Sequence, residues 1–156
     1  MLEIDLPNYK KLELNHLIMD YNGTLACDGE LVSGVKDVLQ ELSHYLNIHV
    51  ITADTFGKVE ATFAQDPYTV KVLPRDNQVQ EKLNYIRSLN SKHCVCIGNG
   101  RNDMLMLQEA ELSLAVILEE GLSVETMQYS DVVINGIMPA LNLLKYPLRL
   151  KATLRS

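Results

Sequence analysis

Short apolar runs alternate with amphipathic segments along most of this chain, and that alternation limits its possible folds more than any other feature. Runs with the length and residue types of buried strands occupy residues 16–20, 48–52, 68–73, 93–98, 112–117 and 130–134. Segments with helical spacing of apolar residues occupy residues 34–46, 55–65, 77–89, 102–110, 122–128 and 136–144. Strands separated by helices form a mostly parallel sheet that is covered on both faces. We therefore expect a Rossmann-like, three-layer α/β/α domain.

The N-terminal residues stand outside this alternation. The stretches "LEIDLP" and "KKLELN" predict a small hairpin, which we expect to pack on an edge of the sheet. Ser33 stands just before the first predicted helix, where we expect it to cap the N-terminus. The chain contains no internal repeat, low-complexity tract or linker, so we expect residues 1–156 to form a single domain.

Charge and hydropathy exclude several classes of protein. A formal net charge of −6 argues against nucleic-acid binding, whose footprint is normally basic. No apolar run is long enough to span a bilayer, and the N-terminus carries acids and a proline where a signal peptide has an apolar core. The basic residues near the end of the chain are typical of a solvated helix face: Lys145, Arg149, Lys151 and Arg155. We expect a cytoplasmic protein with no nucleic-acid or membrane partner.

The cysteines and histidines do not predict a metal site. Cys94 and Cys96 would share one face of a strand, where we expect them to pack in the core. The four histidines are scattered, and no cluster of Cys and His has metal-ligand spacing. His49 lies inside a predicted strand, so we expect it to be a strand residue rather than a base.

Polar side chains follow three of the predicted strands at the point where each strand ends. Asp20 ends the first run in "HLIMD", and Thr52 ends the second. Asn99 and Asp103 follow the fourth run, in the loop "GNGRND". Ligands of open α/β sheets bind outside the carboxyl ends of the strands. A carboxylate there can attack a phosphoryl group and form an aspartyl phosphate, and the turn at Gly23 can present backbone N–H groups to phosphate oxygens.

A magnesium ion would complete such a site. Phosphoryl transfer depends mainly on positioning and charge compensation. Mg²⁺ is usually held by one or two carboxylates together with the phosphate of the substrate. Asp20 and Asp103 are the natural carboxylate pair.

The order of these features resembles the haloacid dehalogenase superfamily. An Asp-x-x-Gly-Thr loop, a strand-end Thr, a helix Lys and a Gly-x-Gly-x-Asn-Asp loop follow one another as in that family. The motif pattern runs from Asp20 to Asp103, and "YSDVVI" together with the expected sheet extends the resemblance to about residue 145. Within the superfamily, the chain is most similar to the phosphorylation domain of P-type ATPases, here free-standing.

The resemblance implies a role for each matching residue. Asp20 would be the nucleophile, and Thr52 and Ala53 in "VITAD" would bind the phosphate together with Gly23. Lys82 in "VQEKLNYIR" would be the lysine that binds the phosphate. Lys71 is the alternative, but it lies in the middle of a predicted strand.

The same resemblance implies a Mg²⁺ site with two unusual residues. The metal ligands would be Asp20, Asp103, the side chain of Asn99 and the backbone carbonyl of Asn22. Phosphatases of the family usually have a general acid and base at the position of Asn22, where a proton-transfer group is worth about 10²–10⁴-fold in rate. An aspartate usually stands at the position of Asn99 and binds the metal directly. We therefore expect slow turnover and weak Mg²⁺ affinity.

The spacing of the motifs leaves no room for a cap domain. About 30 residues separate Asp20 from Thr52, and about as many separate Thr52 from Lys82. The predicted strands and helices already use these segments, apart from a small hairpin flap in "ACDGELVSG". An open site suits either a macromolecular substrate or a homo-oligomer whose neighbouring subunit covers it, as in the capless octulosonate-phosphate phosphatases of the superfamily.

These residues favour a Mg²⁺-dependent phosphatase or phosphotransferase that acts on a phosphorylated substrate. A phosphate-binding or regulatory module with little catalysis is the main alternative, favoured by Asn22 and Asn99. A receiver-type signalling domain would need an acidic pair on an early strand, and none lies near Asp20. A dinucleotide-binding loop would need a third glycine in "GNGRND" and a place after the first strand.

Overall fold

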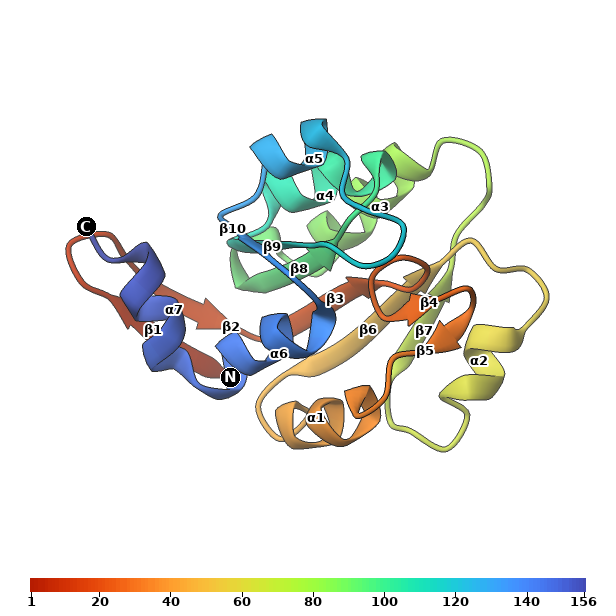
Figure 1. Cartoon of the computed structure of the whole chain (residues 1–156), viewed down its shortest axis with the longest axis horizontal. Helices are drawn as coiled ribbons and strands as arrows, with labels where there is room; N and C mark the ends of the chain where they lie inside the picture. The colour runs from red at the N-terminus through yellow and green to blue at the C-terminus, as the bar shows by residue number, and fades with distance from the viewer.

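The computed structural model describes all residues, 1–156, and its centre is one six-stranded sheet (Figure 1). The strands are β3 (His16–Asp20), β6 (Asn47–Thr52), β7 (Thr69–Val72), β8 (Cys94–Gly98), β9 (Leu112–Val116) and β10 (Val132–Ile134). All neighbours pair in parallel, in the spatial order β10-β9-β8-β3-β6-β7. This doubly wound order reverses direction at β3, which is the first strand of the sheet. It confirms the predicted fold class and differs from the order of receiver-type domains.

Alternate side chains of each strand pack on opposite faces of this sheet. In β3, Leu17 and Met19 belong to one buried apolar cluster and Ile18 belongs to another. Cys94 and Cys96 of β8 lie in the same cluster as Ile18, as buried free thiols. Strand side chains alternate with period 2, so a sheet buried on both faces requires near-continuous apolar runs. The predicted core position of the two cysteines is confirmed.

Helices form the two outer layers. One face of the sheet is covered by α1 (Val35–Leu42), α2 (Lys58–Thr62) and α6 (Ile137–Lys145). The other face is covered by α3 (Gln78–Ser88), α4 (Met104–Glu109) and α5 (Val124–Gln128) (Figure 1). Two 3-10 turns, η1 (Ser91–His93) and η2 (Arg101–Asp103), stand before β8 and α4.

The predicted N-terminal hairpin is present, but it does not extend an edge of the main sheet. Strands β1 (Leu2–Leu6) and β2 (Lys10–Leu14) form a separate two-stranded sheet at the start of β3. A final helix, α7 (Pro147–Leu154), packs against β1 (Figure 1). The inward side chains of the hairpin are buried in the larger apolar cluster: Ile4, Leu6, Leu12 and Leu14. None of the helices combines the length and the apolar character that a membrane-spanning segment needs.

The beginning of α1 differs from the prediction. The residue before this helix is Gly34, with φ of 84° and no side-chain cap. Ser33 therefore does not cap α1, and that prediction is wrong. Glycine adopts this left-handed backbone conformation without strain because it has no Cβ atom.

The second helix is shorter than predicted because Asp54 holds the chain before it in a turn. Its carboxylate accepts hydrogen bonds from the backbone N–H groups of Phe56, Lys58 and Val59. Local bonds of this kind compete with helix formation. Only Lys58–Thr62 is helical, where the apolar spacing predicts a helix over 55–65.

Candidate active site

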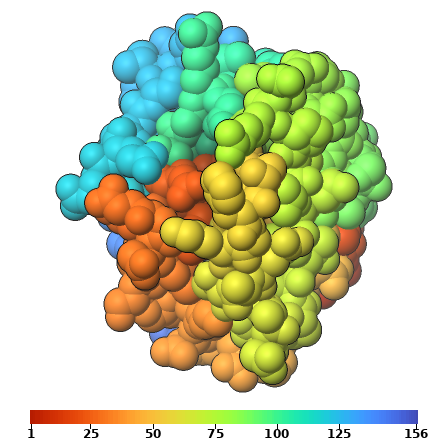
Figure 2. All heavy atoms as spheres, turned by 90° about the vertical axis from the view of Figure 1, so that its right-hand side faces the viewer, coloured from red at the N-terminus to blue at the C-terminus, as the bar shows by residue number.

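The carboxyl ends of β3, β6 and β8 meet at one edge of the sheet and form a cleft. Because β3 pairs with both β6 and β8, the ends of these strands lie side by side. The cleft has a volume of about 430 Å³. It is lined by Asp20, Asn22, Thr52, Ala53, Gln78, Asn99, Gly100, Arg101, Asn102 and Glu120. In Figure 2 it lies where red-orange spheres form a hollow between cyan and yellow ones.

No domain covers this cleft. Between the first two motifs the chain adds only α1 and the flap made by β4 (Ala26–Cys27) and β5 (Glu30–Leu31). Between the second and third motifs it adds α2 and β7. The predicted lack of a cap domain is therefore confirmed.

At the floor of the cleft, Lys82 joins two carboxylates. Its Nζ lies 2.8 Å from Oδ1 of Asp20 and 2.6 Å from Oδ1 of Asp103. The side chains of Lys82 and Asp103 are buried, at 2% and 0% exposed, whereas that of Asp20 is 13% exposed. Asp20 is thus the member of this triad that a ligand in the cleft can reach. The alternative lysine, Lys71, is exposed on β7, with its Nζ 5.9 Å from the ring of Tyr85.

Burial and neighbouring charges together raise the pKa values of both Asp20 and Lys82, for different reasons. Burial and the charge of Asp103 raise the pKa of Asp20 to about 7, against the opposing effect of Lys82. Burial alone would lower the pKa of Lys82, but the charges of Asp103 and Asp20 hold it above its ordinary value. Lys82 therefore stays protonated, and one ammonium group compensates two carboxyl groups. Perturbed groups of this kind, exposed to a cleft, are typical of catalytic sites.

Asp103 also shapes the loop that follows β8. Its Oδ2 accepts hydrogen bonds from the backbone N–H groups of Asn99 and Gly100, each at 3.0 Å. A Cβ atom at Gly98 would lie 2.5 Å from Cγ of Asp103, so the carboxylate can sit here only beside a glycine. Both oxygens of Asp103 are engaged, and the residue does not line the cleft. Its role as a metal ligand stays a prediction.

The loop after β3 lies directly against the loop after β8. Gly23 has φ of 76°, and a Cβ atom there would lie 2.5 Å from Oε2 of Glu120 and 2.6 Å from Nδ2 of Asn99. Buried Thr24 donates a hydrogen bond to Oδ1 of Asn99 at 3.3 Å, and Asn99 donates to the carbonyl of Gly121. The N–H of Gly23 donates to the carbonyl of Ala26 at 2.8 Å. The predicted phosphate contact of Gly23 stays a prediction. It would require the N–H of Gly23 to leave the carbonyl of Ala26 and bond to the phosphate instead.

The loop after β6 supplies a hydroxyl group and a backbone donor. Thr52 is 2% exposed, lines the cleft and accepts a hydrogen bond from the N–H of Asp54 through Oγ1 at 2.9 Å. Its hydroxyl hydrogen remains available as a donor. Ala53 lines the cleft beside it. Both residues therefore lie at the cleft, and the phosphate-binding roles predicted for Thr52 and Ala53 stay predictions.

The oxygen atoms around the cleft are of the chemical types that bind magnesium ions. The carboxylate of Asp20 and the side chains of Asn22, Asn99 and Glu120 all line it, and carboxylate and carbonyl oxygens are the ligands of hard cations. No group of three or more His, Cys, Asp and Glu side chains is gathered for a metal anywhere in the structure. A metal site here would thus depend on amide or backbone oxygens as well as on carboxylates.

Sequence reasoning missed Glu120. This exposed carboxylate lines the cleft and follows β9, the next strand of the sheet. The rule that ligands bind at the carboxyl ends of parallel strands would have found it in "LEEG". It also missed Gln78 and Asn102, whose side chains form a 2.7 Å hydrogen bond at the rim of the cleft.

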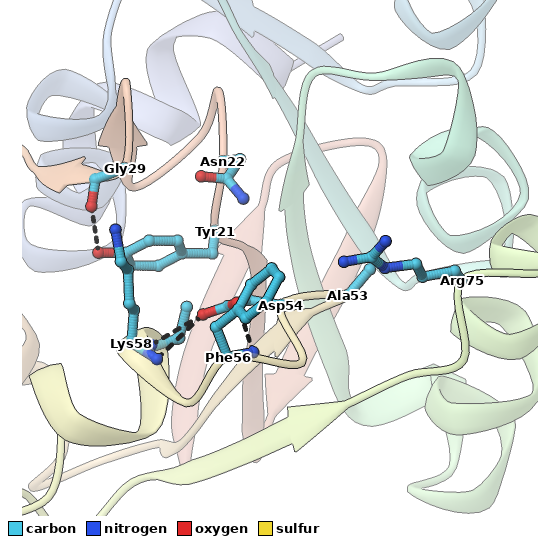
Figure 3. Close-up of a pocket in the computed structure, with 9 residues that line it drawn as sticks. Tyr21, Asn22, Gly29, Ala53, Asp54, Phe56, Lys58 and Arg75 are labelled. Carbon is cyan, nitrogen blue, oxygen red and sulfur yellow. Dashed lines mark hydrogen bonds between the residues drawn. The ribbon is translucent and has the colours of Figure 1, made fainter.

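A second cavity adjoins the cleft on the side of α2 (Figure 3). It has a volume of about 380 Å³ and shares Asn22 and Ala53 with the cleft. Tyr21 forms one side of it and Arg75 lies on the other, as Figure 3 shows.

Solved structures that share this fold include phosphatases and hydrolases of the haloacid dehalogenase superfamily. One is the 3-deoxy-D-manno-octulosonate 8-phosphate phosphatase of Moraxella catarrhalis, solved with a magnesium ion, a phosphate ion and KDO (20% identity, TM-score 0.66, covering 85% of this chain and 86% of that one). Another is a phosphoserine phosphatase solved as a phospho-aspartyl intermediate analogue (12% identity, TM-score 0.62, covering 86% and 99%). The chain therefore has the haloacid dehalogenase fold, in a form without a cap domain.

Comparison of the amino-acid sequence, unlike comparison of the fold, identifies a family for this chain. No known protein-family profile matches the chain. It is 46% identical over 65 residues to the uncharacterized protein MJ0073 of Methanocaldococcus jannaschii, a match that spans 42% of this chain and 70% of MJ0073. The chain belongs to the same family as MJ0073.

Proposed function

We propose that this protein is a Mg²⁺-dependent phosphohydrolase or phosphotransferase that forms an aspartyl phosphate on Asp20. One observation carries this proposal: the partly exposed carboxylate of Asp20 lies on the floor of the cleft, 2.8 Å from a buried lysine that a second carboxylate fixes. The solved phosphatases support it, because one holds magnesium and phosphate and another represents a phospho-aspartyl intermediate.

In the first step, a carboxylate oxygen of Asp20 attacks the phosphorus atom, and the bond from phosphorus to the leaving oxygen breaks. The hydroxyl group of Thr52 would hold a phosphoryl oxygen, and the buried ammonium group of Lys82 would offset charge from beneath Asp20. A direct contact of Lys82 with the phosphoryl group would require its ammonium group to turn away from the two carboxylates. A bound Mg²⁺ ion, held by Asp20, Asp103, Asn99 and the backbone carbonyl of Asn22, would supply further charge neutralisation. The leaving oxygen takes its proton from water, since the amide of Asn22 cannot give one.

In the second step, water attacks the aspartyl phosphate and releases inorganic phosphate, which regenerates the carboxylate of Asp20. Asn22 lines the cleft where a general base would remove a proton from that water. Because an amide cannot accept it, we expect this step to be slow and the aspartyl phosphate to accumulate, as in P-type ATPases.

A phosphate-binding module without turnover is the second candidate, and the amides of Asn22 and Asn99 favour it. The intact arrangement of Asp20, Lys82 and Asp103 favours the enzyme, because binding alone does not require a nucleophile. We also propose the cytoplasm as compartment, a phosphorylated substrate, and no nucleic-acid or membrane partner. A homo-oligomer that covers the open cleft stays a prediction.

The test is exposure of the purified protein to Mg²⁺ and acetyl phosphate, followed by an acid quench. Intact mass spectrometry and a phosphate assay then follow the adduct and the released phosphate, with Asp20→Asn as control. A phosphoryl adduct in the parent protein and none in Asp20→Asn is the expected result. Neither adduct nor phosphate in the parent would favour the binding module.

A further inference from the structure

The second cavity carries more positive than negative charge at its walls. Lys58 and Arg75 both line it, and neither forms an ion pair. The one acid that lines the cavity is Asp54, whose carboxylate accepts hydrogen bonds from three backbone N–H groups. These bonds hold the pKa of Asp54 below its ordinary value, with that of the Phe56 N–H the strongest. Asp54 is thus committed to its own loop, which leaves two cations for a ligand.

Two aromatic side chains, Tyr21 and Phe56, also line the cavity. Tyr21 is buried and fixed, since its hydroxyl group donates to the carbonyl of Gly29 at 3.1 Å (Figure 3). Phe56 is 81% exposed, and the guanidinium carbon of Arg75 lies 5.8 Å from the centre of its ring. An exposed phenyl ring beside a cation offers an apolar surface next to a charge.

The cavity is placed to receive what a phosphoryl group is attached to. It meets the cleft at Asn22 and Ala53, which line both. A phosphoryl group at Asp20 would therefore have its ester oxygen near this junction and the rest of the molecule over Phe56. A volume of about 380 Å³ is within the roughly 300–1,000 Å³ of small-molecule sites. This size favours a small substrate over a protein segment.

We propose that this cavity is a leaving-group subsite, and that the substrate is a small phosphomonoester with a second anionic group. One of the two cations, Lys58 or Arg75, binds that group from its own side of the cavity (Figure 3). The second group is a carboxylate or a further phosphate, because both pair with ammonium and guanidinium groups. This inference rests on the proposed function for the position of the phosphoryl group.

Three phosphate esters with the same carbon skeleton test the proposal. Glycerol 3-phosphate has a neutral leaving group, 3-phosphoglycerate adds a carboxylate, and glycerol 1,3-bisphosphate adds a second phosphate. With Mg²⁺ present, we expect kcat/KM to be about tenfold or more higher for at least one of the anionic esters, a difference that one charge-assisted contact supplies. Which of the two is preferred identifies the second group.

Matched variants locate the effect. Either Lys58→Gln or Arg75→Gln should remove most of the preference and bring kcat/KM for the anionic ester close to that for glycerol 3-phosphate. The variant that does so identifies the cation that binds the second group. Lys92→Gln and Arg155→Gln remove exposed cations that form no ion pair and lie outside the cavity, so the preference should persist. Equal kcat/KM for the three esters in the parent protein would overturn the subsite.

A binding measurement separates this proposal from the proposed function. Isothermal titration calorimetry of Asp20→Asn, and of the parent protein, with the same three esters needs no turnover. Tighter binding of an anionic ester that is lost in Lys58→Gln or in Arg75→Gln would support the subsite even if no adduct ever forms. Equal binding of all three esters, or no binding of any, would overturn the subsite even where acetyl phosphate modifies Asp20.

Discussion

The ammonium group of Lys82 lies 2.8 Å from the carboxylate of Asp20, at the end of the strand where the sheet reverses direction. Asp103 holds the same ammonium group from the other side at 2.6 Å. One buried cation therefore keeps two carboxyl groups together, and only Asp20 has access to the cleft. Both the stability of the fold and the chemistry of the site should therefore depend on this contact.

Lys82→Met should be strongly destabilising. It leaves two carboxyl groups facing each other without their cation, and breaking one partner out of a buried ion pair costs about 3–5 kcal/mol. Urea unfolding measures the free energy of unfolding. Lys71→Met, on the exposed β7 residue, is the matched control and should change it by no more than about 1 kcal/mol, since it removes only an exposed contact with the ring of Tyr85. Equal losses in the two variants would contradict the role given to Lys82.

Gly23→Ala should cost more than Gly29→Ala, although both glycines have positive φ. Their φ angles are 76° and 82°, so the backbone strain of about 1 kcal/mol is common to both. A Cβ atom at Gly23 would lie less than 3 Å from the side chain of Asn99, which hydrogen bonds hold in place, whereas one at Gly29 meets nothing within 4 Å. The exposed side chain of Glu120 is also within 3 Å, but it can move aside. Unfolding free energies of the pair isolate this clash. Equal losses would show that the two loops are not in contact.

Asn22→Asp should speed breakdown of the aspartyl phosphate. A carboxylate at this exposed position on the rim of the cleft can accept the proton of the attacking water, which is worth about 10²–10⁴-fold. The adduct at steady state should fall and phosphate release should rise, as followed by quenched intact mass and phosphate assay. An unchanged adduct lifetime would remove Asn22 as the reason for slow turnover.

Glu120→Gln should weaken Mg²⁺ binding roughly tenfold, as loss of a supporting carboxylate does at other metal sites. The carboxylate of Glu120 lines the cleft where Asn99 supplies only an amide. Calorimetric titration with Mg²⁺ in the presence of phosphate measures the affinity directly. The neighbouring Glu119→Gln removes an exposed carboxylate that does not line the cleft and is the control. The same loss of affinity in both variants would indicate a general charge effect.

His49 should make the protein less stable in acid. It is 6% exposed and bonds to His16 at 3.0 Å and to the hydroxyl group of Tyr85 at 2.9 Å. Burial, and then the charge of His16, lower its pKa from 6.5 to about 4. Because its pKa is lowered in the folded state, the contribution of His49 to the free energy of unfolding is fully present above pH 6.5 and is lost as the pH drops toward 4. The loss reaches about 3 kcal/mol at about 1.4 kcal/mol per pKa unit.

Urea unfolding between pH 7.5 and pH 4.5 measures this dependence. The raised pKa of Asp20 contributes to stability in the opposite sense over the same pH range, so the contribution of His49 is measured as the difference between the parent protein and His49→Gln. This difference should grow as the pH falls, with His49→Gln the less sensitive to acid. His44→Gln alters an exposed histidine and should keep the slope of the parent protein. The same dependence on pH in His49→Gln as in the parent protein would contradict the role given to His49.

The sequence by itself determined the elements, the layers and the edge of the sheet where the chemistry lies. The period of apolar residues differs between strands and helices, so "HLIMD" and "HCVCIG" predict buried strands and their polar ends predict the site. Asp20, Thr52 and Asn99 could be found in this way because each is fixed by the strand that it follows. Cys94 and Cys96 could likewise be assigned to one face of a strand.

Only the tertiary structure decided which side chains meet. The order β10-β9-β8-β3-β6-β7 brings Lys82 from α3 to Asp20, places Glu120 at the cleft and buries Asp103 beneath it. It also joins the turn at Asp54 to the loop after β3, and so creates the cavity of Lys58 and Arg75. Local periodicity cannot encode these contacts, because they join residues that are far apart in the chain and depend on strand order and on the direction of each loop.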